Sequence, residues 1–165
     1  MAPISSMKQG ILEPSLSFVE PMKAFTVQEL PAGRWLYEVK FDGYRTLAFK
    51  NGRETRLVSR NQKDFTKFPQ LNDALKLLNA GQVVIDGEIT ALDSSGKSSF
   101  QLLQAYEIGE QRPPLVYYGF DLLFLEGADL RKKPLVERRR QLEKLLRKPP
   151  DNIRFSAELR GGRDE

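Results

Sequence analysis

The pair Asn51-Gly52 is the local feature that most restricts how this chain folds. Asn-Gly between two extended segments is a strong signal for a two-residue β-hairpin turn, because both residues readily adopt the positive φ that such a turn requires. The segments on either side, 44–50 and 55–60, are strand-like, and so is the earlier segment 35–40. We therefore expect antiparallel strands near the middle of the chain.

The other predicted elements alternate between strands and helices. In chain order they are a helix over 68–79, strands over 82–86 and 88–93, a short helix that Ser98 or Ser99 caps and that ends near Tyr106, a long strand over 115–125, a basic helix that Pro149-Pro150 ends, and a strand over 153–157. This order, with hairpin-type turns between neighbouring strands, predicts an α+β fold in which antiparallel sheets are flanked by helices.

Residues 38–45, Glu-Val-Lys-Phe-Asp-Gly-Tyr-Arg, contain the strongest candidate for a reactive side chain. Lys40 follows an apolar stretch and is expected at the end of a buried strand, where burial disfavours an ammonium group. An ordinary lysine amine is almost entirely protonated at neutral pH and is a poor nucleophile. Partial burial and the neighbouring Arg45 would favour the neutral amine and free its lone pair for attack.

The composition excludes several kinds of chemistry. The chain has no cysteine and no histidine, which rules out thiol catalysis, disulfides, the usual structural zinc sites and histidine acid–base relays. A metal is expected to be a hard ion that oxygen atoms hold and that arrives with a phosphate. No segment is long and apolar enough to span a membrane, and residues 1–21 lack the apolar core of a signal peptide, which suits a cytoplasmic protein.

Three further side chains are candidates for function. Arg60 follows a predicted strand, where it either reaches into a cleft or lies exposed on an edge strand. Glu88 begins a predicted buried strand, a place where carboxylates are rare. Phe120 lies in the long predicted strand, where core packing is the usual role of an aromatic residue and stacking on a ligand is the alternative.

The net charge of +4 is distributed unevenly along the chain. Residues 131–148 carry nine basic and two acidic side chains. Such a segment can bind the phosphate backbone of a nucleic acid. Charge density alone, however, favours a solvated helix face.

Together these blocks resemble the covalent nucleotidyltransferases, which include ATP-dependent DNA ligases, RNA ligases and mRNA capping enzymes. Residues 40–45 match the Lys-x-Asp-Gly-x-Arg signature of that family, and the blocks 59–61, 86–88 and the strand containing Phe120 follow in the family's order. Residues 35–45, 57–61, 120–123 and 134–139 are most similar to the ligase domain of bacterial and archaeal end-joining DNA ligases. The resemblance covers roughly residues 20–160 and implies the fold of the N-terminal part of the adenylation domain.

The resemblance implies roles for the candidate residues. Lys40 would attack the α-phosphate of ATP, form a lysyl-AMP phosphoramidate and release pyrophosphate, with Asp42 orienting the amine or assisting a metal. Glu38 would read the adenine edge, Phe120 would stack on adenine, Glu88 would hold the ribose hydroxyls, and Arg45 and Arg60 would contact the ribose, the phosphates or the DNA end. The implied cofactors are ATP and Mg²⁺ or Mn²⁺, the metal being held mainly through phosphate and at most by Glu88 or Asp42.

The implied partner is nicked or broken double-stranded DNA in repair and recombination, with end-joining repair proteins as further candidates and a nucleoid-associated location in the cytoplasm. The residues expected to contact DNA are Arg131, Lys132, Lys133, Arg138 and Arg139. Two alternatives stay open at this point: an RNA ligase or capping guanylyltransferase, and a non-catalytic remnant that binds nucleic acid or a partner through residues 131–148.

The sequence departs from the family pattern towards its C-terminal end. The later Glu-Gly and Lys-x-Lys blocks of the family, whose lysines hold the triphosphate, are not found in these 165 residues, and neither is an oligonucleotide-binding barrel. We expect residues 1–20 to be a poorly ordered extension and residues 21–165 to be a partial adenylation domain. The isolated chain is then expected to adenylate itself poorly and not to seal a nick.

Overall fold

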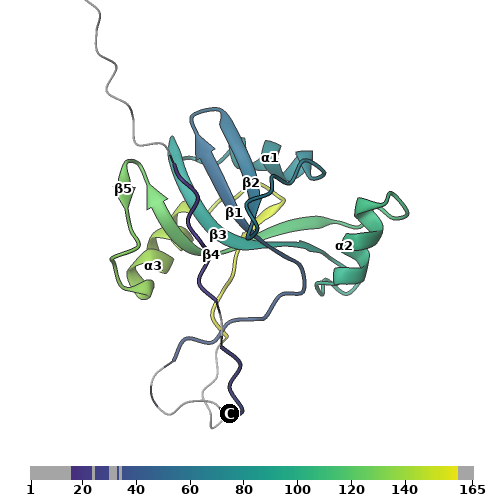
Figure 1. The fold of residues 1–165 in the computed structure, drawn as a ribbon, viewed down its shortest axis with the longest axis horizontal. Coiled ribbons are helices and arrows are strands. Elements are labelled where there is room, and N and C mark those ends of the chain that lie inside the picture. Colours follow the sequence, from purple (N-terminus) through teal and green to yellow (C-terminus); the bar gives the residue numbers. More distant parts are fainter. Residues whose placement is uncertain (1–15, 24, 30–32, 34, 160–165) are drawn as a thin grey trace, which may run out of the picture.

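A six-stranded sheet forms the centre of the protein in the computed structural model, which describes residues 16–23, 25–29, 33 and 35–159 (Figure 1). The strands are β1 (Tyr44–Asn51), β2 (Glu54–Ser59), β3 (Gln82–Ala91), β4 (Leu115–Leu125), β5 (Ala128–Asp129) and β6 (Ile153–Phe155). Their order is β2-β1-β3-β4-β5, and all these neighbours are antiparallel, whereas β6 pairs with β4 in parallel.

Three helices flank the sheet: α1 (Pro69–Lys76), α2 (Phe100–Glu107) and α3 (Leu135–Leu145). Proline begins α1, where its missing N–H costs no helical hydrogen bond. The Ser99 hydroxyl accepts a hydrogen bond from the Leu102 N–H and caps α2, as the sequence predicted. The structure therefore has the predicted α+β class, with an antiparallel sheet flanked by helices. None of the described helices is long and apolar enough to cross a membrane.

Side chains alternate between the two faces of the sheet, as strand geometry requires. In β1, Ala48 belongs to the main core, whereas Leu47 and Phe49 lie on the opposite face. In β3, Ile85 belongs to the main core, and Val84 lies on the opposite face. All three helices contribute side chains to the main core, so the face bearing Leu47, Phe49 and Val84 is the face that the helices leave uncovered.

Residues 16–23 cover part of that second face. Leu16, Phe18 and Val19 pack against the smaller apolar cluster there, and Figure 1 shows this segment (purple) running across the sheet. Burial of these side chains removes apolar surface from water and fixes the segment to the sheet. Residues 16–20 of the predicted N-terminal extension thus lie against the sheet, and its remainder, residues 1–15, lies outside the described residues.

Two glycines allow the close packing of β3 against its neighbours. A Cβ added at Gly87 would lie 2.4 Å from the Tyr118 carbonyl oxygen and 2.5 Å from the Tyr117 ring. Tyr117 is fully buried, and its hydroxyl donates to the Ile85 carbonyl at 2.9 Å. A Cβ at Gly43 would lie 2.1 Å from the Ile89 carbonyl oxygen. Gly43 thus lets the chain between Lys40 and β1 pass close to β3.

Three predictions of secondary structure need correction. Residues 35–40 do not form a strand: Glu38 makes one isolated bridge with Glu158, and Trp35 and Lys40 are exposed. No sheet partner runs beside the rest of this segment in the described part of the chain. The predicted strands 82–86 and 88–93 are one strand, β3, because Gly87 continues the β ladder instead of turning it.

Candidate active site

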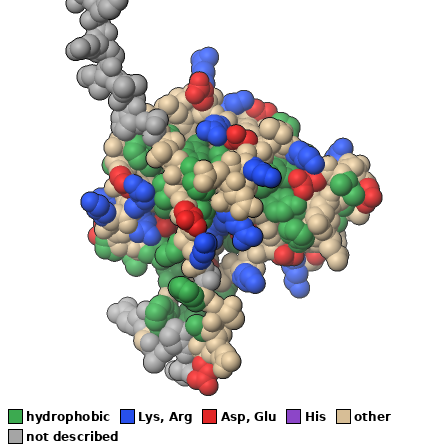
Figure 2. All heavy atoms as spheres, viewed as in Figure 1, with side chains coloured by type: hydrophobic (Ala, Val, Ile, Leu, Met, Phe, Trp, Pro, Cys, Tyr) green, Lys and Arg blue, Asp and Glu red, His purple; other side chains and the backbone are tan. Residues whose placement is uncertain are grey.

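A cavity of about 630 Å³ brings together five of the residues that the sequence predicted to bind the nucleotide. Its lining includes Glu38, Lys40, Arg45, Glu88 and Phe120. Val19 and Leu123 of the smaller apolar cluster also line it, so the cavity lies on the face of the sheet that residues 16–23 cross. Figure 2 shows acidic and basic side chains gathered near the middle of this face. We call this space the active-site cavity.

Lys40 reaches the cavity from the irregular segment that precedes β1. Its side chain is exposed, so the prediction that it ends a buried strand is wrong. The other described cations of the lining are all ion-paired: Lys23 with Glu20, Arg45 with Asp86, Arg131 with Asp129, and Arg138 with Asp121. Within the described residues no carboxylate pairs with Lys40. Its amine is therefore the one cation of this lining that is available to a ligand.

Arg45 connects three parts of the cavity. Its guanidinium donates two hydrogen bonds to the Asp86 carboxylate, both at 2.7 Å, and lies 4.2 Å from the centre of the Phe120 ring. Burial raises the pKa of Asp86 above its ordinary value, and the Arg45 charge opposes that shift. The pair holds one face of the aromatic ring against a cation. A planar ligand that stacks on Phe120 is thereby directed to the other face of the ring.

Glu88 faces Arg45 across the ladder between β1 and β3. Burial raises the pKa of Glu88, while the Arg45 charge and a hydrogen bond with the Gly43 backbone act in the opposite direction. Its carboxylate therefore lies in a partly buried, polar part of the wall. It can accept hydrogen bonds from hydroxyl groups of a ligand.

Two residues that were predicted to act on the nucleotide do not line the cavity. The Asp42 N–H donates to the Ser98 hydroxyl at 3.0 Å, and its carboxylate accepts from the Phe100 N–H at 2.9 Å. Asp42 thus fixes the lysine-containing loop to the start of α2, so the prediction that it orients the amine or assists a metal has no support from this geometry. Arg60 is exposed in the turn after β2, which leaves its predicted contact with the nucleotide equally unsupported.

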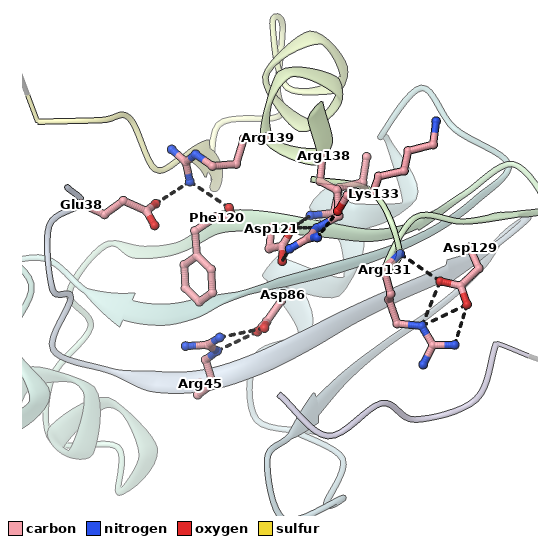
Figure 3. A network of polar contacts seen from close by, with 11 residues as sticks. Glu38, Arg45, Asp86, Phe120, Asp121, Asp129, Arg131, Lys133, Arg138 and Arg139 are labelled. Atoms are coloured by element: carbon pink, nitrogen blue, oxygen red, sulfur yellow. Dashed lines mark hydrogen bonds and ion pairs between the residues drawn. The ribbon is translucent and has the colours of Figure 1, made fainter. Parts of the chain in front are cut away.

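The basic helix α3 is arranged differently from the prediction. Arg139 is only 3% exposed, and it binds Glu38 and the main-chain carbonyls of Phe120 and Ser156 (Figure 3). Arg138 pairs with Asp121 through two hydrogen bonds of 2.8 and 2.9 Å. Burial and carboxylate pairing occupy both guanidiniums, so this geometry gives no support to the prediction that Arg138 and Arg139 contact DNA.

The remaining members of the predicted DNA-binding set lie in the segment between β5 and α3. Arg131, Lys132 and Lys133 are exposed. Arg131 pairs with Asp129 at 2.6 Å, and its guanidinium lowers the pKa of Asp129 to about 2. The DNA-binding role of these three residues stays a prediction.

The sequence analysis did not predict which residues support the cavity wall from behind, although the spacing of one of them in the sequence indicates its position. Arg139 lies four residues after Leu135 and three before Leu142, so helical spacing places it on the apolar side of α3. Asp86 belongs to the block 86–88, but its pairing with Arg45 cannot be predicted without the β1–β3 register. Nothing in the local sequence indicates that residues 19–23 line the cavity.

The comparison with protein-family models decides which family the chain belongs to. The family model described as "ATP dependent DNA ligase domain" matches residues 17–164. The chain belongs to this family. The match favours the DNA ligase prediction over an RNA ligase or a capping enzyme.

Named relatives of this ligase domain give the same result. The chain is 41% identical over 155 residues to the multifunctional non-homologous end joining protein LigD of Pseudomonas aeruginosa, covering 92% of the chain and 18% of that protein. It is 33% identical over 152 residues to DNA ligase 1 of Korarchaeum cryptofilum, covering 87% of the chain and 28% of that protein. The chain thus spans less than a third of the length of either relative.

Solved structures agree with the fold. The ligase domain of M. tuberculosis LigD matches with a TM-score of 0.64 and 34% identity, over 77% of this chain and 40% of that one. The Chlorella virus DNA ligase-adenylate matches with a TM-score of 0.57 over 87% of this chain and 51% of that one; at 19% identity this likeness concerns the fold alone. The ligase domain described here therefore has the adenylation-domain fold that its sequence predicted.

Proposed function

We propose that this ligase domain binds ATP in the active-site cavity and transfers AMP to the amine of Lys40. The amine attacks the α-phosphorus, a nitrogen–phosphorus bond forms, and the bond to the pyrophosphate oxygen breaks. The amine loses a proton, and pyrophosphate leaves with the bonding electrons. The observation that carries this proposal is the position of Lys40, an unpaired cation in a described cavity wall whose other cations are all paired.

The neighbouring side chains suit the other parts of the nucleotide. The Phe120 ring offers one free face to a base, because Arg45 lies over the other face. Glu88 can accept hydrogen bonds from the ribose hydroxyls. Fixed charges around a phosphorus centre are the main means by which a protein accelerates such a transfer. The positions of Arg45 and Glu88 on neighbouring strands keep these groups in place without a ligand.

A divalent metal would be held mainly by the phosphates of ATP. Among the described residues there is no group of three or more acidic, histidine or cysteine side chains that could hold an ion. Asp86 is occupied by Arg45 and Asp42 by the start of α2, which leaves Glu88 as the one predicted metal ligand that lines the cavity. Mg²⁺ would supply charge neutralisation at the phosphates, and one carboxylate with phosphate oxygens is a usual way to hold it.

We further propose that DNA is the acceptor of the AMP. The support is the family match and the likeness to relatives whose names specify DNA ligase and end joining. The DNA 5′-phosphate would take the AMP, and a 3′-hydroxyl would then displace it. Lys132 and Lys133 are exposed near the cavity-lining Arg131 and are the side chains best placed to meet a phosphate backbone. End-joining partners and a nucleoid-associated, cytoplasmic location stay predictions.

Nucleotide competition tests the proposal. The chain is incubated with Mg²⁺ and ATP that is labelled at the α-phosphate, in the presence of an excess of unlabelled ATP or GTP. We expect ATP to suppress covalent labelling and GTP to leave it nearly unchanged. Equal suppression by GTP would indicate a capping-type enzyme. Salt-sensitive DNA binding without any labelling would indicate a non-catalytic remnant.

A further inference from the structure

We infer that Arg139 is a positioning residue for base recognition: it fixes the Glu38 carboxylate at the cavity and thereby makes the preference for adenine depend on helix α3. This inference rests on the proposed function, because it assigns the element that sets the base specificity of the same site. It concerns a residue of the basic helix that the sequence had assigned to DNA.

The contacts of Arg139 join three separate segments of the chain. One terminal nitrogen, Nη1, donates to Glu38 Oε1 and, at 2.8 Å, to the Phe120 carbonyl. The other, Nη2, donates to the Ser156 carbonyl at 2.6 Å. Figure 3 shows Phe120 between the Glu38–Arg139 pair and the Arg45–Asp86 pair. The two residues predicted to contact the adenine, Glu38 and Phe120, are therefore held by the same nitrogen atom.

Burial makes this arrangement rigid. Arg139 is 3% exposed, and its guanidinium also lies 4.9 Å from the centre of the Phe155 ring. A charged group so far from water is stable only with close partners, and Glu38 supplies the opposite charge. Arg139 has no other carboxylate partner among the described residues. Glu38, on an otherwise irregular segment, is thereby held to helix α3.

The same contacts leave one oxygen of Glu38 for a ligand. The Ser156 hydroxyl donates to Oε1 at 3.0 Å, so both supporting hydrogen bonds reach Oε1. No hydrogen bond reaches Oε2 within the described part of the chain. Because Glu38 lines the cavity, Oε2 can accept a hydrogen bond from the 6-amino group of adenine. Guanine carries an oxygen at this position, which a carboxylate oxygen repels.

A purely structural role predicts a different outcome from a positioning role. Loss of a structural arginine lowers the folded fraction and weakens every nucleotide equally. Loss of a positioning arginine releases Glu38 and removes the advantage of nucleotides that carry a 6-amino group. The ratio of two affinities, measured on the same sample, does not depend on the folded fraction. The comparison of ATP with purine riboside triphosphate, which lacks only the amino group, therefore isolates the positioning role.

The test measures the dissociation constants of both nucleotides for the complete chain and for Arg139→Met. We expect the unchanged chain to prefer ATP by roughly tenfold or more, the size of one hydrogen bond to a charged group. Arg139→Met should reduce this preference to about twofold or less and leave the affinity for purine riboside triphosphate nearly unchanged. Arg140→Met, an exposed neighbour on α3, is the matched control and should keep the full preference.

Two further variants cover the case in which Arg139→Met does not fold. Ser156→Ala removes only the weaker support of Glu38 Oε1 and should reduce the preference partially. Glu38→Ala removes the acceptor and should abolish the preference, and adding Ser156→Ala to it should cause no further loss. A preference for ATP that stays intact in Arg139→Met or in Ser156→Ala would overturn the inference and leave the proposed function standing. Absence of any preference in the unchanged chain would overturn the inference, and absence of binding by either nucleotide would overturn both.

Discussion

At the scale of single residues, the active-site cavity combines carboxylates that are costly to bury with one free amine. Asp86 and Glu88 both have raised pKa values because of burial, and Arg45 compensates them only in part. Charged groups in such positions lower the stability of the folded state, and they are frequent at functional sites for that reason. Lys40 lies on the same wall without a carboxylate partner among the described residues.

The pH dependence of stability tests this account at Glu88. Its pKa is raised in the folded state, so its contribution to stability is complete below the ordinary value near 4.5 and is lost as the pH rises through the folded-state pKa. Glu88→Gln does not titrate. We therefore expect the melting temperature of the variant, relative to the unchanged protein, to increase between pH 4 and pH 7. The measurement is a series of thermal unfolding curves, and a relative melting temperature that decreases over this range would contradict the assignment.

At the scale of elements, the pairing of β3 with β1 and β4 builds the cavity wall. Gly87 lies between Asp86 and Glu88 and packs on the buried Tyr117 ring. The strand can carry two carboxylates towards the cavity only because it continues through this glycine without a turn. The packing of the strand and the position of the charged groups are thus determined at one residue.

The substitution Gly87→Ala tests the importance of this contact. The added Cβ would meet the Tyr118 carbonyl and the Tyr117 ring, neither of which can move freely, so we expect a loss of roughly 1–3 kcal/mol or more. Gly81→Ala, at the start of the same strand region, meets only the flexible Glu126 side chain and should change stability by about 0.5 kcal/mol or less. Denaturant unfolding of both variants decides the matter. Equal losses would show that the close approach at Gly87 is unimportant.

The element scale also shows what the sequence could and could not predict. Local signals predicted the β1–β2 hairpin, the Ser99 cap and the position of α3, because turns and caps depend on neighbouring residues. The turn itself is shifted by one residue from the predicted Asn51-Gly52 to Gly52-Arg53, because Asn51 pairs with Glu54 as the last residue of β1. Local signals failed for residues 35–40 and for the unbroken β3, because strand formation depends on partners distant in sequence. Local signals could not predict the Arg139–Glu38 pair either, because its members lie 101 positions apart in the sequence. Helical spacing indicates only that Arg139 faces inward.

At the scale of the whole molecule, two of the nine basic side chains of residues 131–148 are directed inward, and the other seven are exposed. Arg138 lines the cavity, Arg139 supports it through Glu38 and Phe120, and Arg131 is paired with Asp129. Lys132 and Lys133 are exposed, and they remain to meet an external anion such as the DNA backbone. Since the chain covers 40% of the LigD ligase-domain structure that it matches, we expect DNA contacts of the isolated chain to be few.

The salt dependence of DNA binding tests the role of these lysines. Each lysine that contacts a phosphate contributes about 0.9 to the slope of log affinity against log salt concentration. We therefore expect Lys132→Ala and Lys133→Ala each to lower the slope for nicked duplex by about that amount. Lys97→Ala, in the exposed turn after β3, is the control. Unchanged slopes in both lysine variants would remove this segment from the DNA interface.

The central claim is that the Lys40 amine accepts AMP from ATP, and the intact mass of the chain after incubation with ATP and Mg²⁺ tests it most directly. We expect a slowly formed adduct of one AMP, which peptide mapping places on Lys40. The adduct should disappear in Lys40→Ala, since this variant removes only an exposed amine and leaves the fold intact, and it should persist in Lys97→Ala. An adduct that survives in Lys40→Ala, or a folded chain that forms none after prolonged incubation, would contradict the account.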